Sequence, residues 1–186
     1  MKKDIRIQPL LYPMPVILLS TYNEDGSVDV MNAAWGCQID ADMLGVCLSP
    51  HKTTENIART KAAVIQLATA KHIVEADYVG VVSAHKEPKK FEKSGLHAHK
   101  ASKVNAPIIE EFPIALECEF LYDDKESGMH YFKVVNASAE EDVLDEKGHV
   151  SLKKLDAVLF STLDSKYYAI GEEVAPAFRC GLAKMK

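Results

Sequence analysis

Several kinds of chemistry find little support because of what this sequence lacks. Its four cysteines lie far apart and none forms a C-x-x-C pair, which argues against a dithiol redox centre or a cysteine-rich metal site. Most of them lie in apolar runs, where a reduced cysteine packs as a small hydrophobe, and we expect the same of Cys37. No stretch approaches the ~18 apolar residues of a membrane helix, and "KKDIRIQPL" after Met1 is too polar for a secretory signal. We therefore expect a cytoplasmic protein.

Positive charge is also scarce. The 186 residues carry 22 Lys and Arg against 27 Asp and Glu, a formal net charge of -5, which argues against nucleic acid or an anionic membrane as a partner. The basic cluster "HKEPKKFEK" at 85–93 is either a solvated helix face or a contact for a small anion. The length suits a single domain over 1–186, and no linker or repeat divides it.

The motifs of common enzyme classes are missing as well. The sequence has no G-x-S-x-G, G-x-x-x-x-G-K-[ST], H-E-x-x-H or G-x-G-x-x-G. His97 and His99 flank Ala98 on a polar stretch, where we expect exposed loop histidines and no metal site. Nothing here indicates an enzyme that supplies its own acid and base, so catalytic residues stay unassigned.

What the sequence does contain is a succession of short apolar and β-branched runs. Expected helices begin near Thr53, Lys71 and Pro88, and the expected strands cover 15–21, 27–40, 42–49, 62–69, 115–124, 129–144, 157–162 and 166–171. Asp25-Gly26 predicts a hairpin between the first two strands. Because the long crossovers of a parallel sheet are mostly missing, we predict a mainly β fold, an antiparallel barrel that is closed or split, with peripheral helices.

Two stretches could form a binding site. In "NAAWG", residues 32–36, small neighbours would let a flat group approach the only tryptophan, Trp35, although a core tryptophan would give the same pattern. In "SPHKTTENIART", residues 49–60, a helix start offers unpaired N–H groups, and Thr53 and Thr54 add hydroxyls, or the helix is merely capped. With Lys89 and Lys90 as a second cationic segment, the combination describes a mononucleotide with an aromatic ring system, such as FMN.

The order of four segments is similar to that of a known family. "YPMPVILLSTYNEDGSVDVMNAAW", "LGVCLSPHKTTENIARTKAAVIQLAT", "KKFEKSGL" and "GMHYFKVVNASAE" resemble the flavin reductase-like, FMN-binding split-barrel family, which includes the flavoredoxins. The resemblance covers roughly residues 12–170. It implies a six-stranded Greek-key split barrel that binds FMN non-covalently, usually as a homodimer with the cofactor near the subunit interface.

The resemblance also implies which residues bind the cofactor. The flavin ring, ribityl chain and phosphate would meet Asn32, Ala33, Trp35, Ser49, Lys52, Thr53, Thr54, Lys90, His130 and Phe160. Many members carry an arginine before the threonine of the phosphate region, whereas this chain has His51 and Lys52. A lysine is a point charge without the arginine's bidentate fork, so phosphate binding here would depend more on hydroxyls and backbone.

The implied activity is that of an oxidoreductase of flavin reductase or flavoredoxin type. Electrons would pass from a reduced donor, NADH, NADPH or a redox protein, through FMN to an acceptor. The missing nucleotide-binding fingerprint does not decide between these donors. A second functional hypothesis is a flavin- or haem-binding module without catalytic activity.

Overall fold

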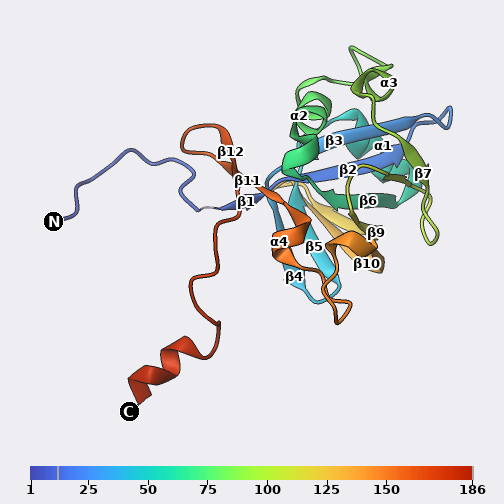
Figure 1. The fold of residues 1–186 in the computed structure, drawn as a ribbon. Coiled ribbons are helices and arrows are strands. Elements are labelled where there is room, and N and C mark those ends of the chain that lie inside the picture. The colour runs from blue at the N-terminus through green and yellow to red at the C-terminus, as the bar shows by residue number, and fades with distance from the viewer. Residues whose placement is uncertain (12, 186) are drawn as a thin grey trace.

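A seven-stranded antiparallel sheet forms the body of the protein (Figure 1). The computed structural model describes residues 1–11 and 13–185; residue 12, and residue 186 at the end of the expected domain, lie outside the described residues. In chain order the strands are β2 (Ile17–Tyr22), β3 (Val28–Ala33), β4 (Gly36–Asp40), β5 (Met43–Cys47), β6 (Ala62–Leu67), β9 (Ile114–Asp124) and β10 (Met129–Ala139). Their order across the sheet is β3-β2-β6-β9-β10-β5-β4.

The two edge strands of this sheet are consecutive in the chain. Only Ala34 and Trp35 separate β3 from β4, yet these strands lie at opposite edges, so the sheet must curl round to meet itself. Counted as one bent strand, they leave six strands in which three hairpin-connected strands are followed by a fourth beside the first, the Greek-key arrangement. The predicted split barrel is confirmed. The single strand expected over 27–40 is wrong in one respect, because it bends at Ala34 and Trp35.

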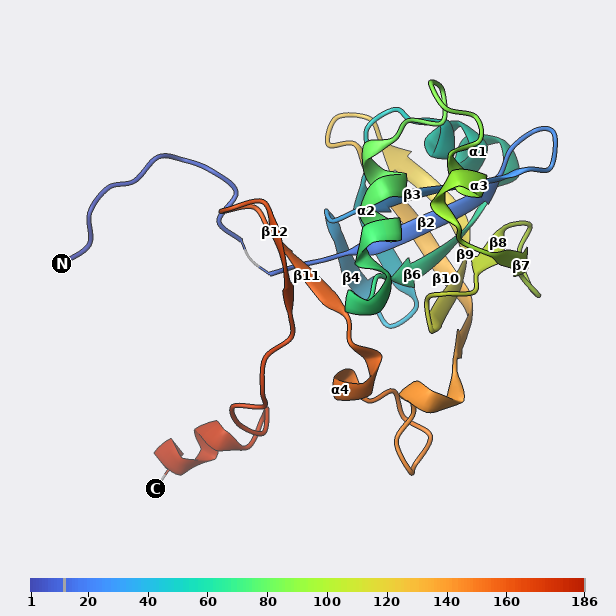
Figure 2. The ribbon, with the colours of Figure 1, turned by 45° about the horizontal axis from the view of Figure 1, so that its top comes forward.

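One helix covers an opening of the barrel, and two others pack on the outer face of its sheet (Figure 2). α1 (Lys52–Thr60) connects β5 to β6, and α2 (Ile73–Val81) and α3 (Lys90–Ser94) lie between β6 and β9. The helix expected over 71–84 is a short 3-10 turn, η1 (Ala70–His72), followed by α2, which ends because Val82 is extended. Gly95 ends α3 at a φ of +73°, as its position after the last helical residue predicts.

A smaller three-stranded sheet lies beside the barrel. It consists of β1 (Met14–Pro15), β11 (Val158–Ser161) and β12 (Lys166–Ala169), in the order β1-β11-β12. The remaining elements were not expected from the sequence; they are β7 (Ala98–Lys100), β8 (Pro107–Ile109), η2 (Glu141–Val143) and α4 (Leu152–Leu155). β10 ends at Ala139, five residues before the end of the strand expected over 129–144, because η2 follows.

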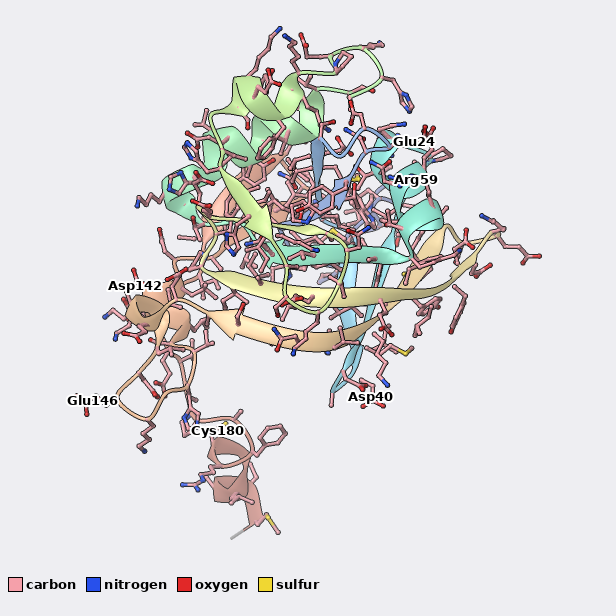
Figure 3. The ribbon with its side chains drawn as sticks, turned by 90° about the vertical axis from the view of Figure 1, so that its right-hand side faces the viewer. Glu24, Asp40, Arg59, Asp142, Glu146 and Cys180 are labelled. Carbon is pink, nitrogen blue, oxygen red and sulfur yellow. The ribbon has the colours of Figure 1, made fainter. Side chains whose placement is uncertain are left out.

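The hairpin between β2 and β3 fixes the position of α1. Gly26 adopts a φ of +82° in its turn, where only glycine is unstrained. From α1, the Asn56 amide donates to Thr21 Oγ1 at 3.1 Å and to Asn23 Oδ1 at 2.8 Å. Figure 3 shows Arg59 of α1 close to this turn, and its guanidinium donates to Tyr22 O at 2.5 Å. These bonds hold the middle and the last turn of α1 against the β2–β3 hairpin.

Two apolar clusters hold these layers together. Leu19, Ile65 and Phe132 are buried inside the barrel, and Val16, Val79 and other residues are buried between the sheet and α2. Both termini extend away from the body, and the C-terminal segment ends in a 3-10 turn, η3 (Cys180–Met185) (Figure 1). Among the helices of the described residues, none has the length and apolar character needed to cross a membrane.

Candidate functional site

A cavity of about 600 Å³ lies between the end of β3, the start of α1, the last turn of α2 and the β11–β12 hairpin. We call it the Trp35 cavity. The structure brings together here eight of the ten residues implied by the family resemblance: Asn32, Ala33, Trp35, Ser49, Lys52, Thr53, Lys90 and Phe160. Segments separated by more than 120 residues in the sequence thus form one site.

An aromatic wall lines one side of the Trp35 cavity. The Trp35 and Phe160 ring centroids are 6.1 Å apart, and the Phe160 and Tyr167 centroids are 5.9 Å apart. Trp35 keeps 47% of its surface exposed, so the alternative of a core tryptophan is wrong. The bend between β3 and β4 causes this exposure, because Trp35 lies outside both strands while its carbonyl accepts from Cys47 N–H at 2.8 Å.

A buried ion pair closes the bottom of the Trp35 cavity. Lys90 Nζ lies 3.1 Å from Asp29 Oδ1, and the two residues are only 4% and 1% exposed. The Thr53 hydroxyl donates to the other carboxylate oxygen, Asp29 Oδ2, at 2.5 Å. Buried charges are tolerated when they are paired and hydrogen-bonded in this way. The sequence did not predict Asp29 as a site residue, because it lies within an alternating strand pattern with no motif around it.

The start of α1 presents backbone amides to the cavity rather than hydroxyl protons. The Thr54 hydroxyl accepts from His51 N–H and donates to His51 O, both at 2.8 Å, and the Thr53 proton is used by Asp29. The first intrahelical bond runs from Glu55 N–H to His51 O at 3.1 Å, so the amides before it have no carbonyl partner within the helix. An anion would meet these amides and the Lys52 ammonium.

The wall formed by α2 contains residues that the sequence interpretation missed. The Asn32 amide donates to Ala76 O at 3.1 Å, and a Cβ on Gly80 would lie 2.8 Å from Asn32 Cβ. Only glycine therefore permits this approach of α2 to β3. Across the cavity, Tyr167 O–H donates to Asp77 Oδ1 at 2.6 Å. Burial and the neighbouring Asp77 carboxylate raise the pKa of Tyr167 to about 12, so it stays a proton donor at neutral pH.

The other two implied residues lie elsewhere. Thr54 and His130 line a separate cavity of about 520 Å³, which meets the Trp35 cavity only through the segment that contains Ser49. His130 Nδ1 is 2.9 Å from Gly128 O, and the imidazole centroid is 5.9 Å from that of Phe120. Within one chain these side chains do not face Trp35, and their contact with a cofactor stays a prediction.

The cysteines differ in their surroundings. Cys37 is exposed, so the expectation that it packs in the interior is wrong; it lies on β4, an edge strand with an exposed face. Cys47 lines the Trp35 cavity. Cys118 is buried, and that burial raises the pKa of its thiol to about 12.

The histidines of the described residues form no metal site. Over residues 1–11 and 13–185, no three His, Cys, Asp or Glu side chains gather in a way that could hold a metal ion. His97 and His99 are exposed and contact Glu111 and Glu110.

Known proteins resemble the chain over most of its length. The model of the family described as "Flavin reductase like domain" matches residues 10–161. A curated relative, "Uncharacterized protein YdfE" of Bacillus subtilis (strain 168), is 26% identical over 199 residues, covering 95% of this chain and 93% of the relative.

Two solved structures share both the fold and part of the sequence. The flavoredoxin of Desulfovibrio vulgaris (Miyazaki F) is 30% identical with a TM-score of 0.90, covering 97% of this chain and all of that one. The flavoredoxin from Methanosarcina acetivorans is 28% identical with a TM-score of 0.87, covering 99% of this chain and all of that one. The likeness therefore extends through the barrel, the helices and the smaller sheet.

Proposed function

This chain belongs to the flavin reductase like domain family, and on that premise we propose that it is an FMN-dependent oxidoreductase of flavin reductase or flavoredoxin type. One observation carries the proposal. A half-exposed tryptophan, the start of a nine-residue helix and two lysines line a single cavity of about 600 Å³. That volume is in the usual range for small-molecule and cofactor sites, roughly 300–1,000 Å³.

The chemistry of the lining suits both ends of FMN. Trp35 and Phe160 offer aromatic surface to a ring system. Lys52 and the amides at the start of α1 suit a phosphate dianion, whereas Lys90 at the base of the cavity is already paired with the buried Asp29 carboxylate. Among the described residues, Lys52 contacts only the exposed Glu55 carboxylate, at 3.4 Å. The carboxylate in the described lining, Asp77, already accepts from Tyr167. The surroundings therefore favour an anionic ligand.

When bound, FMN would supply the electron-carrying ring system, while the protein orients it and controls access. Trp35 and Phe160 would hold the plane of the ring, and the exposed side of Trp35 would leave room for a donor or acceptor to approach. The bond between Tyr167 and Asp77 ties the β11–β12 hairpin to α2 and so keeps Phe160 in the wall. Because Tyr167 stays protonated, this tie is retained throughout the neutral pH range.

Cofactor binding is tested on the purified protein. We expect a yellow protein that releases FMN on denaturation, and an apoprotein that binds FMN at least about 10-fold more tightly than riboflavin, because charge-assisted hydrogen bonds to the phosphate are lost with riboflavin. Lys52→Ala should reduce that ratio, and Lys153→Ala, at an exposed lysine of α4, should not. A colourless protein whose apo form binds neither compound would contradict the proposal.

The electron donor is the finer part of the proposal. Either a nicotinamide nucleotide or a reduced redox protein could approach the open side of Trp35. Anaerobic mixing of the FMN-loaded protein with NADH or NADPH separates them: bleaching of the flavin absorbance within seconds supports a flavin reductase. If both nucleotides leave the absorbance unchanged over many minutes, a redox protein is the donor, as in a flavoredoxin-type carrier.

We also propose that the protein is a cytoplasmic homodimer. Apolar side chains of the N-terminal segment, Ile5, Ile7 and Leu11, are largely exposed on a stretch that extends away from the body, where a second copy would cover them. Light scattering coupled to size-exclusion chromatography should give about twice the chain mass of 20.6 kDa. A mass equal to that of one chain at micromolar concentration would contradict this assembly.

A further inference from the structure

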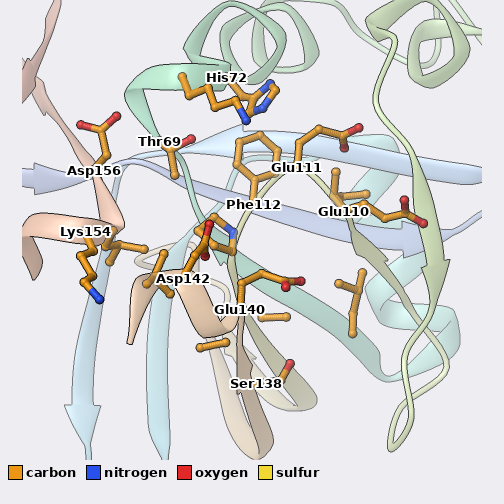
Figure 4. A pocket seen from close by; sticks show the side chains of 18 of the residues that line it. Thr69, His72, Glu110, Glu111, Phe112, Ser138, Glu140, Asp142, Lys154 and Asp156 are labelled. Carbon is orange, nitrogen blue, oxygen red and sulfur yellow. The ribbon is translucent and has the colours of Figure 1, made fainter. Parts of the chain in front are cut away.

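A second and larger cavity, of about 780 Å³, shares no lining residue with the Trp35 cavity. It opens between η1, the segment after β8, the end of β10 and α4 (Figure 4). We call it the acidic cavity. Its charged lining residues are Lys71, Glu110, Glu111, Glu140, Asp142, Lys154 and Asp156, so carboxylates outnumber ammonium groups by five to two.

Much of this negative charge has no partner within the chain. Glu110 and Glu111 contact His99 and His97, and the ammonium of Lys154 donates to a backbone carbonyl, that of Leu144. Among the described residues, no hydrogen bond or ion pair reaches the four charged side chains that remain, three carboxylates and one ammonium: Glu140, Asp142, Asp156 and Lys71. The rim of the cavity therefore attracts a cation.

An unpaired hydroxyl on a largely buried side chain supplies an independent sign of a ligand. Thr69 is only 4% exposed, it lines the acidic cavity, and its hydroxyl forms no hydrogen bond with any described residue although it precedes η1 at the capping position. A buried polar group normally has a partner. Figure 4 shows its side chain beside those of His72 and Phe112. The side chain is otherwise packed by the protein, and its hydroxyl is reached from the cavity, where a ligand atom could pair with it.

Apolar side chains form part of the inner lining of the acidic cavity. Ile109, Phe112, Val143 and Leu155 line it and are all buried, and the His72 imidazole meets the Phe112 ring edge-on at a centroid distance of 6.2 Å. A bare metal ion would leave this surface uncovered, and no metal-binding cluster of three His, Cys, Asp or Glu side chains is found in the part of the chain that the structure describes. The cavity thus suits a molecule that has a hydrocarbon body as well as a positive charge.

We propose that the acidic cavity binds a small organic cation, a primary ammonium carried by a hydrocarbon or aromatic body. The ammonium would lie at the rim beside Glu140 and Asp142 (Figure 4), the body would cover Phe112 and Leu155, and a polar atom at the inner end would pair with Thr69. This site is distinct from the proposed FMN site in both place and charge, and it does not depend on the proposed function.

Benzylamine and its uncharged analogue benzyl alcohol test the proposal as a matched pair. Calorimetric and NMR titrations of the full chain should show benzylamine binding about fivefold more tightly than benzyl alcohol, with shifts in the amide or methyl signals of Thr69, Phe112 and Leu155. Equal affinity of the two compounds, or shifts only at other residues, would overturn the proposal. So would the absence of any shift at about 10 mM benzylamine, since a specific site of this size should bind in the millimolar range.

Variants then locate the charge and the hydroxyl. Glu140→Gln with Asp142→Asn should abolish the preference for benzylamine, whereas Glu119→Gln with Glu126→Gln makes the same change of net charge outside the cavity and should leave it intact. If the two double variants lose the preference equally, general electrostatic attraction explains it and the site does not exist. Thr69→Val, nearly isosteric, should weaken binding of 4-hydroxybenzylamine about threefold or more, because its phenol at the inner end loses its partner, and should leave benzylamine binding unchanged; unchanged binding of both would contradict the role of Thr69.

Discussion

The two cavities lie at opposite ends of one short stretch of chain and use charge in opposite ways. η1 and the residue before it contribute Thr69 and His72 to the acidic cavity, and α2 contributes Asp77 and Gly80 to the Trp35 cavity. In the Trp35 cavity the decisive charges, Lys90 and Asp29, are buried and paired; in the acidic cavity they are exposed at the rim and unpaired. Buried paired charge is part of the fold, whereas exposed charge is free to select a ligand.

The largest effect that tests this contrast comes from breaking the buried pair. Lys90→Met leaves the Asp29 carboxylate buried without its cation, so we expect a loss of about 3–5 kcal/mol in the free energy of unfolding, measured by urea denaturation. Adding Asp29→Asn should recover a large part of the lost unfolding free energy, because no uncompensated charge remains. At the acidic cavity, Glu140→Gln with Asp142→Asn should change the same quantity by only about 0.5 kcal/mol or less. If the two sets of variants lost similar amounts of unfolding free energy, the charges of the two cavities would not differ in their role in the fold.

The next effect concerns the packing of α2 beside the Trp35 cavity. Gly80→Ala would place a Cβ 2.8 Å from Asn32 Cβ, and we expect the unfolding free energy to fall by about 1–3 kcal/mol as α2 shifts outward. Gly171→Ala is the matched control, since nothing lies within 4 Å of the Cβ it would carry. Equal stability of the two variants in thermal denaturation would show that α2 tolerates the displacement and does not define the cavity wall.

A smaller effect appears at alkaline pH. Because the folded state raises the pKa of Tyr167 to about 12 from an ordinary value of 10.0, the unfolded chain loses this proton first, and stability should decline between about pH 10 and pH 12. Tyr167→Phe removes the titrating group and should make this decline shallower in urea denaturation at stepped pH. Tyr122→Phe, at an exposed tyrosine of β9, is the control and should keep the wild-type slope.

The smallest effect lies at the edge of the acidic cavity. A hydrogen bond from the His97 ring to the Glu111 carboxylate raises the pKa of His97, so its contribution to stability is present below the ordinary imidazole pKa of 6.5 and is lost as pH rises through the higher folded value. His97→Ala and Glu111→Gln should each remove this dependence near neutral pH. If either variant keeps the wild-type pH profile, the pair does not form in solution.

The fold was largely predictable from local patterns. Asp25-Gly26 predicts the first hairpin and Gly95 predicts the end of α3, because each residue has a backbone requirement that is visible in the sequence. The bend at Ala34 and Trp35 was not predicted. It arises from closure of the barrel, which involves strands far apart in the chain and leaves no local signal.

The residues of the candidate site also fall into those with a local sequence signal and those placed only by tertiary structure. Residues in recognisable segments, such as Trp35 and Lys90, were predicted, whereas Asp29 and Tyr167 were missed because only tertiary structure brings them to the cavity. One signal was present: Asp77 interrupts an otherwise helical apolar pattern, and the structure shows that it faces the cavity and accepts from Tyr167. A polar residue on an apolar helix face can thus mark a site.

The central claim is that FMN binds against Trp35. The most direct measurement is a titration of the apoprotein with FMN, followed by flavin emission, in the wild type and in Trp35→Leu. We predict that wild-type protein quenches the emission with saturation at one FMN per chain, because the indole contacts the ring. Trp35→Leu should weaken binding about 10-fold or more, the scale of a lost aromatic contact, and leave the remaining bound FMN emissive. Equal affinity and equal quenching in the two proteins would contradict the claim.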